Sequence, residues 1–287
     1  MRIAVVGDVM LDIAVSGKWS GTCPENEQVY NLSGSHMDVY AGGAGNVATI
    51  LTELNATVDL YSDGPGDGKH KWVGELFKSV VRVNKVVWSG YGHLPVKIRG
   101  YVDNEVVSRI DSEQPGCRNG KPSVVANLLI DIHKYDAIIV SDYCKSVFDD
   151  DAMLLLRKVI DRGKNVIIDS KRLGYSMWSG ATAIVPNGKE AWRSYNSVDP
   201  VVVRRKAGVD LVAITNDGTY VDVAWENHTE RLPVNRVPLA FNVGAGDSFA
   251  AGLAIGLCNN NTYNSAVLMA MDISRKYVGK QRRCYLR

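Results

Sequence analysis

The sequence predicts an α/β fold with a doubly wound, mostly parallel sheet and a small β lid. Three observations carry this prediction. Short apolar runs of strand length recur along the chain, helix-compatible stretches lie between or after them, and two further stretches alternate polar with apolar residues. Continuous apolar runs are typical of strands buried on both faces, and their alternation with helices favours parallel pairing. We expect residues 1–287 to form one domain.

The elements follow in chain order from these patterns. The runs expected to form buried strands are Ile3–Val6, Ala137–Val140, Val166–Ile168, Ala183–Val185 and Leu211–Ile214. The segments expected to form helices are Gly45–Leu54, Val124–Ile132, Asp150–Asp161, Lys189–Tyr195 and Ser248–Leu257. Sheets of this kind bind ligands at the carboxyl ends of their strands. The polar residues expected to gather at that edge are Asp8, Asp142, Asp169, Asn187 and Thr215.

Two stretches depart from the βα pattern. Residues 13–40 and 92–112 contain short alternating segments such as Val96–Arg99 and Val106–Asp111. Alternation with a period of two indicates strands that are buried on one face only. We expect these stretches to pair with each other as a small β appendage over the edge of the sheet, where it could act as a lid.

Composition excludes several classes of function. The net charge is only +2 and the basic residues are scattered, which argues against a nucleic-acid-binding surface. The five cysteines include no C-x-x-C pair, so a reduced compartment is favoured over a disulfide framework or a zinc site. No apolar run approaches the roughly 20 residues of a membrane span, and the N-terminus does not resemble a signal peptide. We expect a cytoplasmic protein that binds neither nucleic acid nor a membrane.

The segment Asn242–Ser248 is the most informative motif of the chain. It combines two glycines with a carboxylate at the head of a small-residue helix. Backbone N–H groups at such a helix start can converge on an anion, and the helix dipole adds positive potential there. Asp247 beside them has no evident packing role. The alternative is an ordinary glycine turn with a capping Asp. The position after the last strands favours a phosphate cradle with a carboxylate, which is the minimum for phosphoryl transfer to a hydroxyl.

A second glycine-rich segment, Ala41–Ala48, supports two interpretations. Its G-x-G-x-x-A spacing from Gly43 fits a dinucleotide fingerprint, and Asp63 follows about 20 residues later. This spacing makes an NAD-dependent oxidoreductase the main alternative function. The preceding segment is short and polar, however, and the first strand of the chain lacks a fingerprint. We favour glycines that bring the backbone close to a small polar ligand, with Asn46 offering a donor and an acceptor.

Asn187 and Glu190 lie three residues apart at the start of a predicted helix and therefore share one face. They could organise a magnesium ion through its waters. An ordinary helix cap followed by an early acidic residue is an equally good interpretation. Asp8 and Asp12 bracket the end of the first strand, where their carboxylates could bind sugar hydroxyls or simply support a turn.

Several cations could recognise a phosphorylated substrate. Lys97 and Arg99 lie two apart on a predicted strand and so share a face, which Arg109 on the companion strand could approach. Lys171 follows a strand end and could reach a sugar from below. Guanidinium groups give bidentate contacts to phosphate. A solvated face is the alternative for these side chains.

Taken together, the chain resembles the ribokinase-like (PfkB) family of carbohydrate kinases over nearly its whole length. Ala41–Ala48 resembles the first family signature, Asn242–Gly252 the second, and Asn187–Glu190 the N-x-x-E magnesium motif. Within the family, the chain is most similar to the heptose-7-phosphate kinase domain of the bacterial ADP-heptose pathway. The segments that carry this closer similarity are Gly7–Asp12, Lys97–Arg99, Arg109–Asp111, Ser141–Lys145 and Ile168–Lys171.

The resemblance implies a kinase that uses ATP and Mg²⁺ to phosphorylate a sugar or sugar phosphate. Asp247 would be the general base, and the amides of Gly244, Ala245 and Gly246 would form the anion hole. The residues implied in sugar binding are Asp8, Asp12, Gly42, Gly43, Asn46, Lys97, Arg99, Arg109, Asp142 and Lys171. The residues implied in nucleotide or magnesium binding are Asn187, Glu190, Thr215 and Gly218.

Two further expectations come from the resemblance. Lids in this family often carry dimer contacts, so a homodimer is expected. Residues 241–243 read Phe-Asn-Val where the family usually has an Asp and a Thr, and this departure argues against a monovalent-cation site and one phosphate contact of the family. This departure makes a catalytically silent sugar- or nucleotide-binding member a second alternative function.

Overall fold

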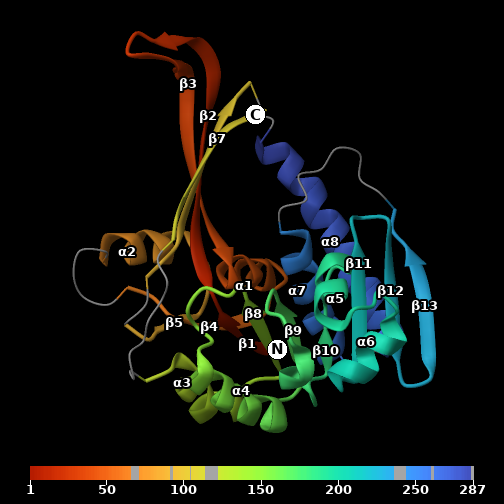
Figure 1. Ribbon diagram of the computed structural model, residues 1–287. Coiled ribbons are helices and arrows are strands. Elements are labelled where there is room, and N and C mark those ends of the chain that lie inside the picture. The colour runs from red at the N-terminus through yellow and green to blue at the C-terminus, as the bar shows by residue number, and fades with distance from the viewer. Residues whose placement is uncertain are drawn as a thin grey trace.

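The computed structural model describes residues 1–65, 71–90, 93–103, 105–113, 122–235, 244–259 and 262–285 (Figure 1). Within these residues a nine-stranded sheet has the order β13-β12-β11-β10-β9-β8-β1-β4-β5. Its strands are β1 (Arg2–Gly7), β4 (Thr57–Ser62), β5 (Lys85–Trp88), β8 (Ala137–Asp142), β9 (Val166–Ser170), β10 (Ala183–Ile184), β11 (Leu211–Asn216), β12 (Tyr220–Trp225) and β13 (His228–Pro233). The seven strands β11, β10, β9, β8, β1, β4 and β5 pair in parallel with their neighbours. β12 and β13 extend the β11 edge with antiparallel pairing.

Helices cover both faces of this sheet. They are α1 (Ala44–Glu53), α2 (Lys71–Val80), α3 (Val124–Asp131), α4 (Asp150–Arg162), α5 (Gly188–Tyr195), α6 (Pro200–Ala207), α7 (Ala245–Cys258) and α8 (Tyr263–Tyr285), with 3₁₀ turns at Ile132–Lys134 and Tyr175–Trp178. Alternate residues of β1 point into different cores. Ile3 and Val5 pack with α1, α2, α7 and α8, while Ala4 and Val6 pack with α3 to α6. The predicted doubly wound α/β fold is therefore confirmed.

A second sheet stands over one end of the first. Its order is β3-β2-β6-β7, formed by β2 (Val9–Cys23), β3 (Asn26–Gly43), β6 (Val96–Val102) and β7 (Glu105–Ser112). β2 and β3 form a long antiparallel hairpin that extends well beyond the rest of the chain (Figure 1). β6 pairs in parallel with β2 and antiparallel with β7. The two alternating stretches thus pair with each other, in strands longer than the sequence pattern indicated.

The two sheets meet where the site was expected. β2 follows β1 almost directly, and β3 runs straight into α1. The base of the hairpin therefore lies at the carboxyl end of β1, beside β8, where the N–H of Asp8 donates to the carbonyl oxygen of Ser141. Parallel strands bring their carboxyl ends to one edge, which is where α/β sheets bind ligands. No described helix is both long enough and apolar enough to span a bilayer. The segment 241–243 lies outside the described residues.

Candidate active site

The N-terminus of α7 is built around Gly244. This residue precedes the helix with φ at 77°, a left-handed conformation that favours glycine, and no side chain caps it among the described residues. A Cβ atom there would lie 2.7 Å from Nδ2 of Asn46 and 2.9 Å from Cε1 of Tyr277. Glycine is therefore required both for the backbone conformation and for the close approach of these two side chains.

The rest of α7 is anchored against α8. A Cβ atom at Gly252 would lie 2.8 Å from Cα of Ala270, and one at Gly256 would lie 2.7 Å from Cα of Ala266. The absence of side chains at these two glycines lets the helix backbones approach closely. Every residue of α7 from Asp247 to Leu257 is buried, so the helix that carries the amides of residues 244–246 is held firmly in the core. These amides belong to the predicted anion hole.

Asp247 lies in the first turn of α7 and is only 5% exposed. Its Oδ2 accepts a 2.6 Å hydrogen bond from Nδ2 of Asn46, and its Oδ1 accepts a 2.8 Å hydrogen bond from the hydroxyl of Tyr143. Burial, with the nearby carboxylate of Asp169, raises the pKa of Asp247 to about 6. The carboxylate is therefore ionised at neutral pH yet basic enough to take a proton from a hydroxyl.

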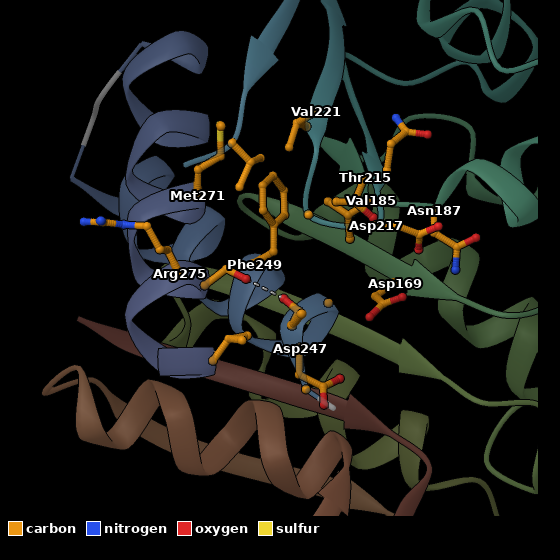
Figure 2. Close-up of a pocket in the computed structure, with 18 of the residues that line it drawn as sticks. Asp169, Val185, Asn187, Thr215, Asp217, Val221, Asp247, Phe249, Met271 and Arg275 are labelled. Carbon is orange, nitrogen blue, oxygen red and sulfur yellow. Dashed lines mark hydrogen bonds between the residues drawn. The ribbon is translucent and has the colours of Figure 1, made fainter. Parts of the chain in front are cut away.

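Two cavities adjoin this carboxylate. The first, of about 680 Å³, lies between α7, α8 and the ends of β9 to β12. Figure 2 shows Asp247 and Asp169 at its base, Met271 and Arg275 of α8 on one side, and Thr215 and Asp217 on the other. The second cavity, of about 490 Å³, lies between the hairpin base, β6 and α1. Of the described residues, those that line both cavities are Tyr143, Gly244 and Asp247.

The second cavity gathers most of the predicted sugar-binding residues. They are Asp12, Gly42, Gly43, Asn46, Lys97 and Arg99. Nη1 of Arg99 lies 2.8 Å from Oδ1 of Asp12, and Nζ of Lys97 lies 3.8 Å from Oε1 of Glu113. A Cβ atom at Gly42 would lie 2.2 Å from Oδ2 of Asp12, so glycine is needed to admit that carboxylate. The cavity therefore presents both carboxylates and cations.

The first cavity gathers the residues predicted to bind nucleotide: Asn187, Glu190, Thr215 and Gly218. Asn187 and Glu190 form a capping box at the start of α5, in which each side chain accepts a hydrogen bond from the other residue's backbone N–H. The ordinary helix-cap interpretation is thus observed. It leaves Oε1 of Glu190 facing Lys171, at 2.9 Å from Nζ. The described residues contain no group of three or more His, Cys, Asp or Glu side chains suited to holding a metal ion.

Asp8 and Asp142 were expected among the sugar-binding residues, but the structure places them outside the linings of both cavities. The buried carboxylate of Asp8 accepts hydrogen bonds from four backbone N–H groups of the loop after β8, at residues 143 and 145–147. Asp142 is also buried and accepts from Ser170 and Arg172. Both carboxylates hold the strand-end loops in place through these hydrogen bonds.

Lys171 and Arg109 also lie elsewhere than expected. Lys171 lines the first cavity and not the second, and its Nζ lies 3.0 Å from Oδ1 of Asp169. Although burial lowers it, the carboxylates of Asp169 and Glu190 raise the pKa of Lys171, which stays charged. Arg109 sits opposite Arg99 in the β6–β7 ladder, but its guanidinium binds Asp111 outside the second cavity.

Two tyrosines of the site, Tyr143 and Tyr277, were not predicted from the sequence. Tyr143 comes one residue after Asp142, which was selected because it follows a strand. The hydroxyl of Tyr143 donates a hydrogen bond to Asp247, whereas Asp142 does not contact it. Tyr277 lies on α8, a helix that no pattern predicted, and its hydroxyl donates a 2.8 Å hydrogen bond to Oδ1 of Asn46. The sequence pattern could not predict this contact, because it joins residues that are 231 positions apart in the chain.

The glycine segment before α1 is not a dinucleotide fingerprint. A Rossmann fingerprint connects a parallel strand of the main sheet to its helix. Here the preceding strand, β3, belongs to the second sheet and pairs antiparallel with β2. A Cβ atom at Gly43 would lie 2.4 Å from the carbonyl oxygen of Asp8, so the glycine serves a close contact between the hairpin base and β1.

A doubly wound sheet with a buried carboxylate at a helix N-terminus, between two cavities, has the parts that a small-molecule phosphotransferase needs. The comparison of sequences agrees with this class. Residues 1–283 match the profile of the pfkB family carbohydrate kinases, and the chain belongs to this family. The family predicted from the sequence, and with it the enzyme class of carbohydrate kinase, is confirmed.

Curated relatives include the bifunctional protein HldE of Aliarcobacter butzleri (strain RM4018), which is 28% identical over 294 residues covering 97% of this chain and 61% of that protein. HldE of Desulfatibacillum aliphaticivorans is 30% identical over 299 residues, covering 97% of this chain and 60% of that protein. The chain thus spans about three fifths of the length of the curated relatives it matches.

Solved structures share the fold. Phosphofructokinase-2 from Escherichia coli, in its tetrameric inhibited form, superposes with a TM-score of 0.70 at 15% identity, covering 99% of this chain and 98% of that one. A carbohydrate kinase from Agrobacterium tumefaciens gives a TM-score of 0.67 at 18% identity, covering 96% of this chain and 90% of that one.

Proposed function

We propose that this protein transfers the γ-phosphoryl group of ATP, with Mg²⁺, to a hydroxyl of a sugar phosphate of the heptose-7-phosphate type. The observation that carries the proposal is the position of Asp247, whose carboxylate lines both cavities at the N-terminus of α7. A donor in the first cavity and an acceptor in the second would meet at this carboxylate. The similarity to HldE proteins supports a sugar phosphate as the acceptor.

The chemistry needs a base and a site for negative charge. Asp247 removes the proton of the acceptor hydroxyl while the hydroxyl oxygen bonds to the γ-phosphorus. The bond from that phosphorus to the β–γ bridging oxygen breaks, and ADP leaves with the electron pair. The amides of Gly244, Ala245 and Gly246 then stabilise the charge on the transferred group. Exclusion of water from the two cavities would keep the phosphoryl group from hydrolysis.

The oxygen donors of the first cavity fit a magnesium ion held mainly through water and nucleotide phosphates. Mg²⁺ retains several waters and is usually bound by only one or two carboxylates. Asp169, Asn187 and Glu190 supply such donors around Lys171. When bound, the ion neutralises charge on the β- and γ-phosphates. Lys171 adds a positive charge beside the same phosphates.

The second cavity suits an acceptor that carries its own phosphate. Asp12, Asn46 and the backbone at Gly42 and Gly43 offer hydrogen-bond partners to hydroxyls. Arg99 is held by Asp12 at 2.8 Å and is largely shielded from solvent, which keeps a charged fork facing the cavity. Lys97 provides a second cation on the same strand face. A phosphate could pair with both.

The test is an assay of ADP release over a panel of sugars and sugar phosphates, with ATP and magnesium. We expect turnover with a phosphorylated heptose or a related sugar phosphate and little with the matching unphosphorylated sugar. Equal use of both would contradict the sugar-phosphate proposal. The catalytically silent alternative is separated by a single-turnover experiment, in which a binding protein gives no phosphorylated sugar at any time.

The second sheet has a proposed role as well. It covers the second cavity through β2, β3 and β6, so we assign it as a lid that closes over the acceptor.

The strands of this second sheet bear exposed apolar side chains, including Trp19, Met37 and Ile110, which suit a contact between two copies of the chain. We propose a homodimer through this lid. Free thiols at Cys23, Cys144 and Cys258 suit a cytoplasmic location.

A further inference from the structure

We propose that Tyr143 is a positioning residue for Asp247, and that it shares this task with the Asn46–Tyr277 pair. The inference rests on the proposed function, because it concerns the base of that reaction. Each carboxylate oxygen of Asp247 has its own donor, the hydroxyl of Tyr143 on Oδ1 at 2.8 Å and the amide of Asn46 on Oδ2 at 2.6 Å. Together the two donors fix the plane of the carboxylate between the cavities.

The Tyr143 arm is held firmly in place. Its backbone N–H donates to Asp8, whose buried carboxylate also binds three later amides of the same loop. The ammonium of Lys171 lies 5.6 Å from the centre of the Tyr143 ring. Burial, with the negative charge of Asp247, raises the pKa of the Tyr143 phenol well above its usual range, so the hydroxyl keeps its proton and acts as a donor.

The Asn46 arm is set by Tyr277. Because the Tyr277 hydroxyl donates to Oδ1 of Asn46, the amide nitrogen of Asn46 is turned towards Asp247. Gly244 leaves the space in which these two side chains meet. Asn46 was expected to contact the sugar alone. In this structure it also links the base to α8, at the far end of the chain.

Several charged groups around Asp247 also act on its pKa, in addition to the two hydrogen bonds. Asp169 at the end of β9 opposes ionisation of Asp247, and Lys171 beside it favours ionisation. Glu190 of α5 offsets part of the Lys171 charge at 2.9 Å, and Asp12 and Arg99 face the base across the second cavity as an ion pair. In this setting the two hydrogen bonds lower the pKa of Asp247 against burial. Loss of either donor should therefore raise that pKa.

The decisive measurement is the titration of Asp247 in the Tyr143→Phe variant without substrate. The carboxyl carbon is followed by NMR in protein labelled with ¹³C-aspartate, and its signal is assigned with Asp247→Asn. A hydrogen bond to a charged group accounts for about one unit of pKa, so we expect the midpoint to rise by about one pH unit from wild type. An unchanged midpoint in Tyr143→Phe would overturn the inference.

Tyr61→Phe is the matched control. Tyr61 is a fully buried tyrosine whose hydroxyl bonds to Tyr135 and Asp131, away from both cavities. Its loss tests the general effect of removing a buried hydroxyl, and the Asp247 midpoint should not move. If Tyr143→Phe does not fold, Tyr277→Phe provides the same test through the Asn46 arm, with a smaller upward shift expected. An unchanged midpoint there would overturn the inference equally.

Kinetics add a second readout. In Tyr143→Phe we expect kcat to fall about tenfold at a pH where Asp247 is fully ionised, because the base is less well oriented, while KM for ATP changes little. The acid limb of kcat should move upward with the NMR midpoint. A wild-type chain that phosphorylates none of the tested sugars would contradict the proposed function. The midpoint shift would still decide the positioning of Asp247.

Discussion

Asp247 combines two properties that conflict in most side chains: it is almost fully buried, and it must carry a charge to act as a base. Burial raises its pKa to about 6, and the Asn46 and Tyr143 donors limit that rise. A pKa near the working pH is what general-base catalysis requires. The same burial makes the charged carboxylate unfavourable for the stability of the fold. Asp247→Asn should therefore lower the rate and raise the free energy of unfolding.

Asp247→Asn should abolish turnover and preserve ATP binding. The amide has nearly the same shape but cannot accept the hydroxyl proton, and loss of general-base assistance costs about 10²–10⁴-fold in rate. The measurement is kcat for the sugar phosphate alongside thermal protection by ATP and magnesium, which should persist. Turnover within a few fold of wild type would remove Asp247 from the mechanism.

The same variant should be more stable than wild type above pH 6. The folded pKa of about 6 exceeds the reference value of 3.8, so wild type loses stability as pH rises between these values and the carboxylate ionises inside the protein. The gain for Asp247→Asn is about 3 kcal/mol at most and should vanish near pH 4. Urea unfolding at several pH values measures it.

Asp59→Asn serves as the contrasting control for this stability effect. Asp59 is also buried, but hydrogen bonds from Asn84, Arg2 and Tyr135 outweigh burial and lower the pKa of its carboxyl group. Its ionised form therefore stabilises the fold, and the neutral substitution should lower stability at neutral pH. Equal effects of the two substitutions would contradict the assignment of opposite pKa shifts.

At the scale of elements, Arg99 and Arg109 form a natural pair for comparison. They lie opposite each other on β6 and β7, yet only Arg99 lines the second cavity. Arg99→Ala should raise KM for the sugar phosphate about tenfold or more and leave KM for ATP nearly unchanged, because a charge-assisted contact of about 1.5–3 kcal/mol is lost. Steady-state kinetics with each substrate varied in turn provide the measurement.

Arg109→Ala is the control. Its guanidinium binds Asp111 and is half exposed, so KM for both substrates should stay near the wild-type value. If both arginine variants raise KM alike, the effect comes from the general charge of the second sheet and not from a phosphate subsite. The contrast is informative because both residues lie on the same face of the sheet.

Sequence patterns predicted some elements much better than others. The apolar runs at Ile3–Val6 and Ala137–Val140 became central parallel strands, because continuous apolar runs have few other places to be buried. β5, β12, β13, α2, α6 and α8 were missed. β12 and β13 form an antiparallel edge, and α8 mixes polar with apolar residues over its length. Such elements owe their stability to tertiary packing, which periodicity alone does not reveal.

In the candidate site too, some residues could be predicted from the sequence and others could not. The first turn of α7, with Asp247, and the glycines at 42–43 lie where the motifs indicated, because glycine-rich turns are set by local backbone geometry. Strand-end position alone did not separate Asp8, which binds loop amides, from Asp12, which faces the second cavity. That difference depends on how the loop after β8 folds back over β1.

At the scale of the whole molecule, the second sheet should respond to the acceptor substrate. Binding in the second cavity should increase protection from amide exchange in β2, β3, β6 and β7 as the sheet closes. Hydrogen-exchange mass spectrometry with and without the sugar phosphate measures this. Protection confined to residues 41–48 and 244–252 would contradict the lid. ATP alone, which would occupy the first cavity, is the control.

The length of the β2–β3 hairpin has a mechanical consequence. β2 spans 15 residues from Val9 to Cys23, which at about 3.3 Å per residue gives an arm of about 50 Å. The arm joins the core at its base, where β2 leaves β1 and β3 enters α1, and β6 pairs beside β2 from Leu11 to Gly17. A rotation of about 5° there, acting over an arm built at that rise per residue, displaces the tip by about 4 Å. A small closing rotation around a ligand therefore produces a much larger displacement at the tip of the hairpin. A fluorophore near the tip would report motions that are barely measurable at the cavity.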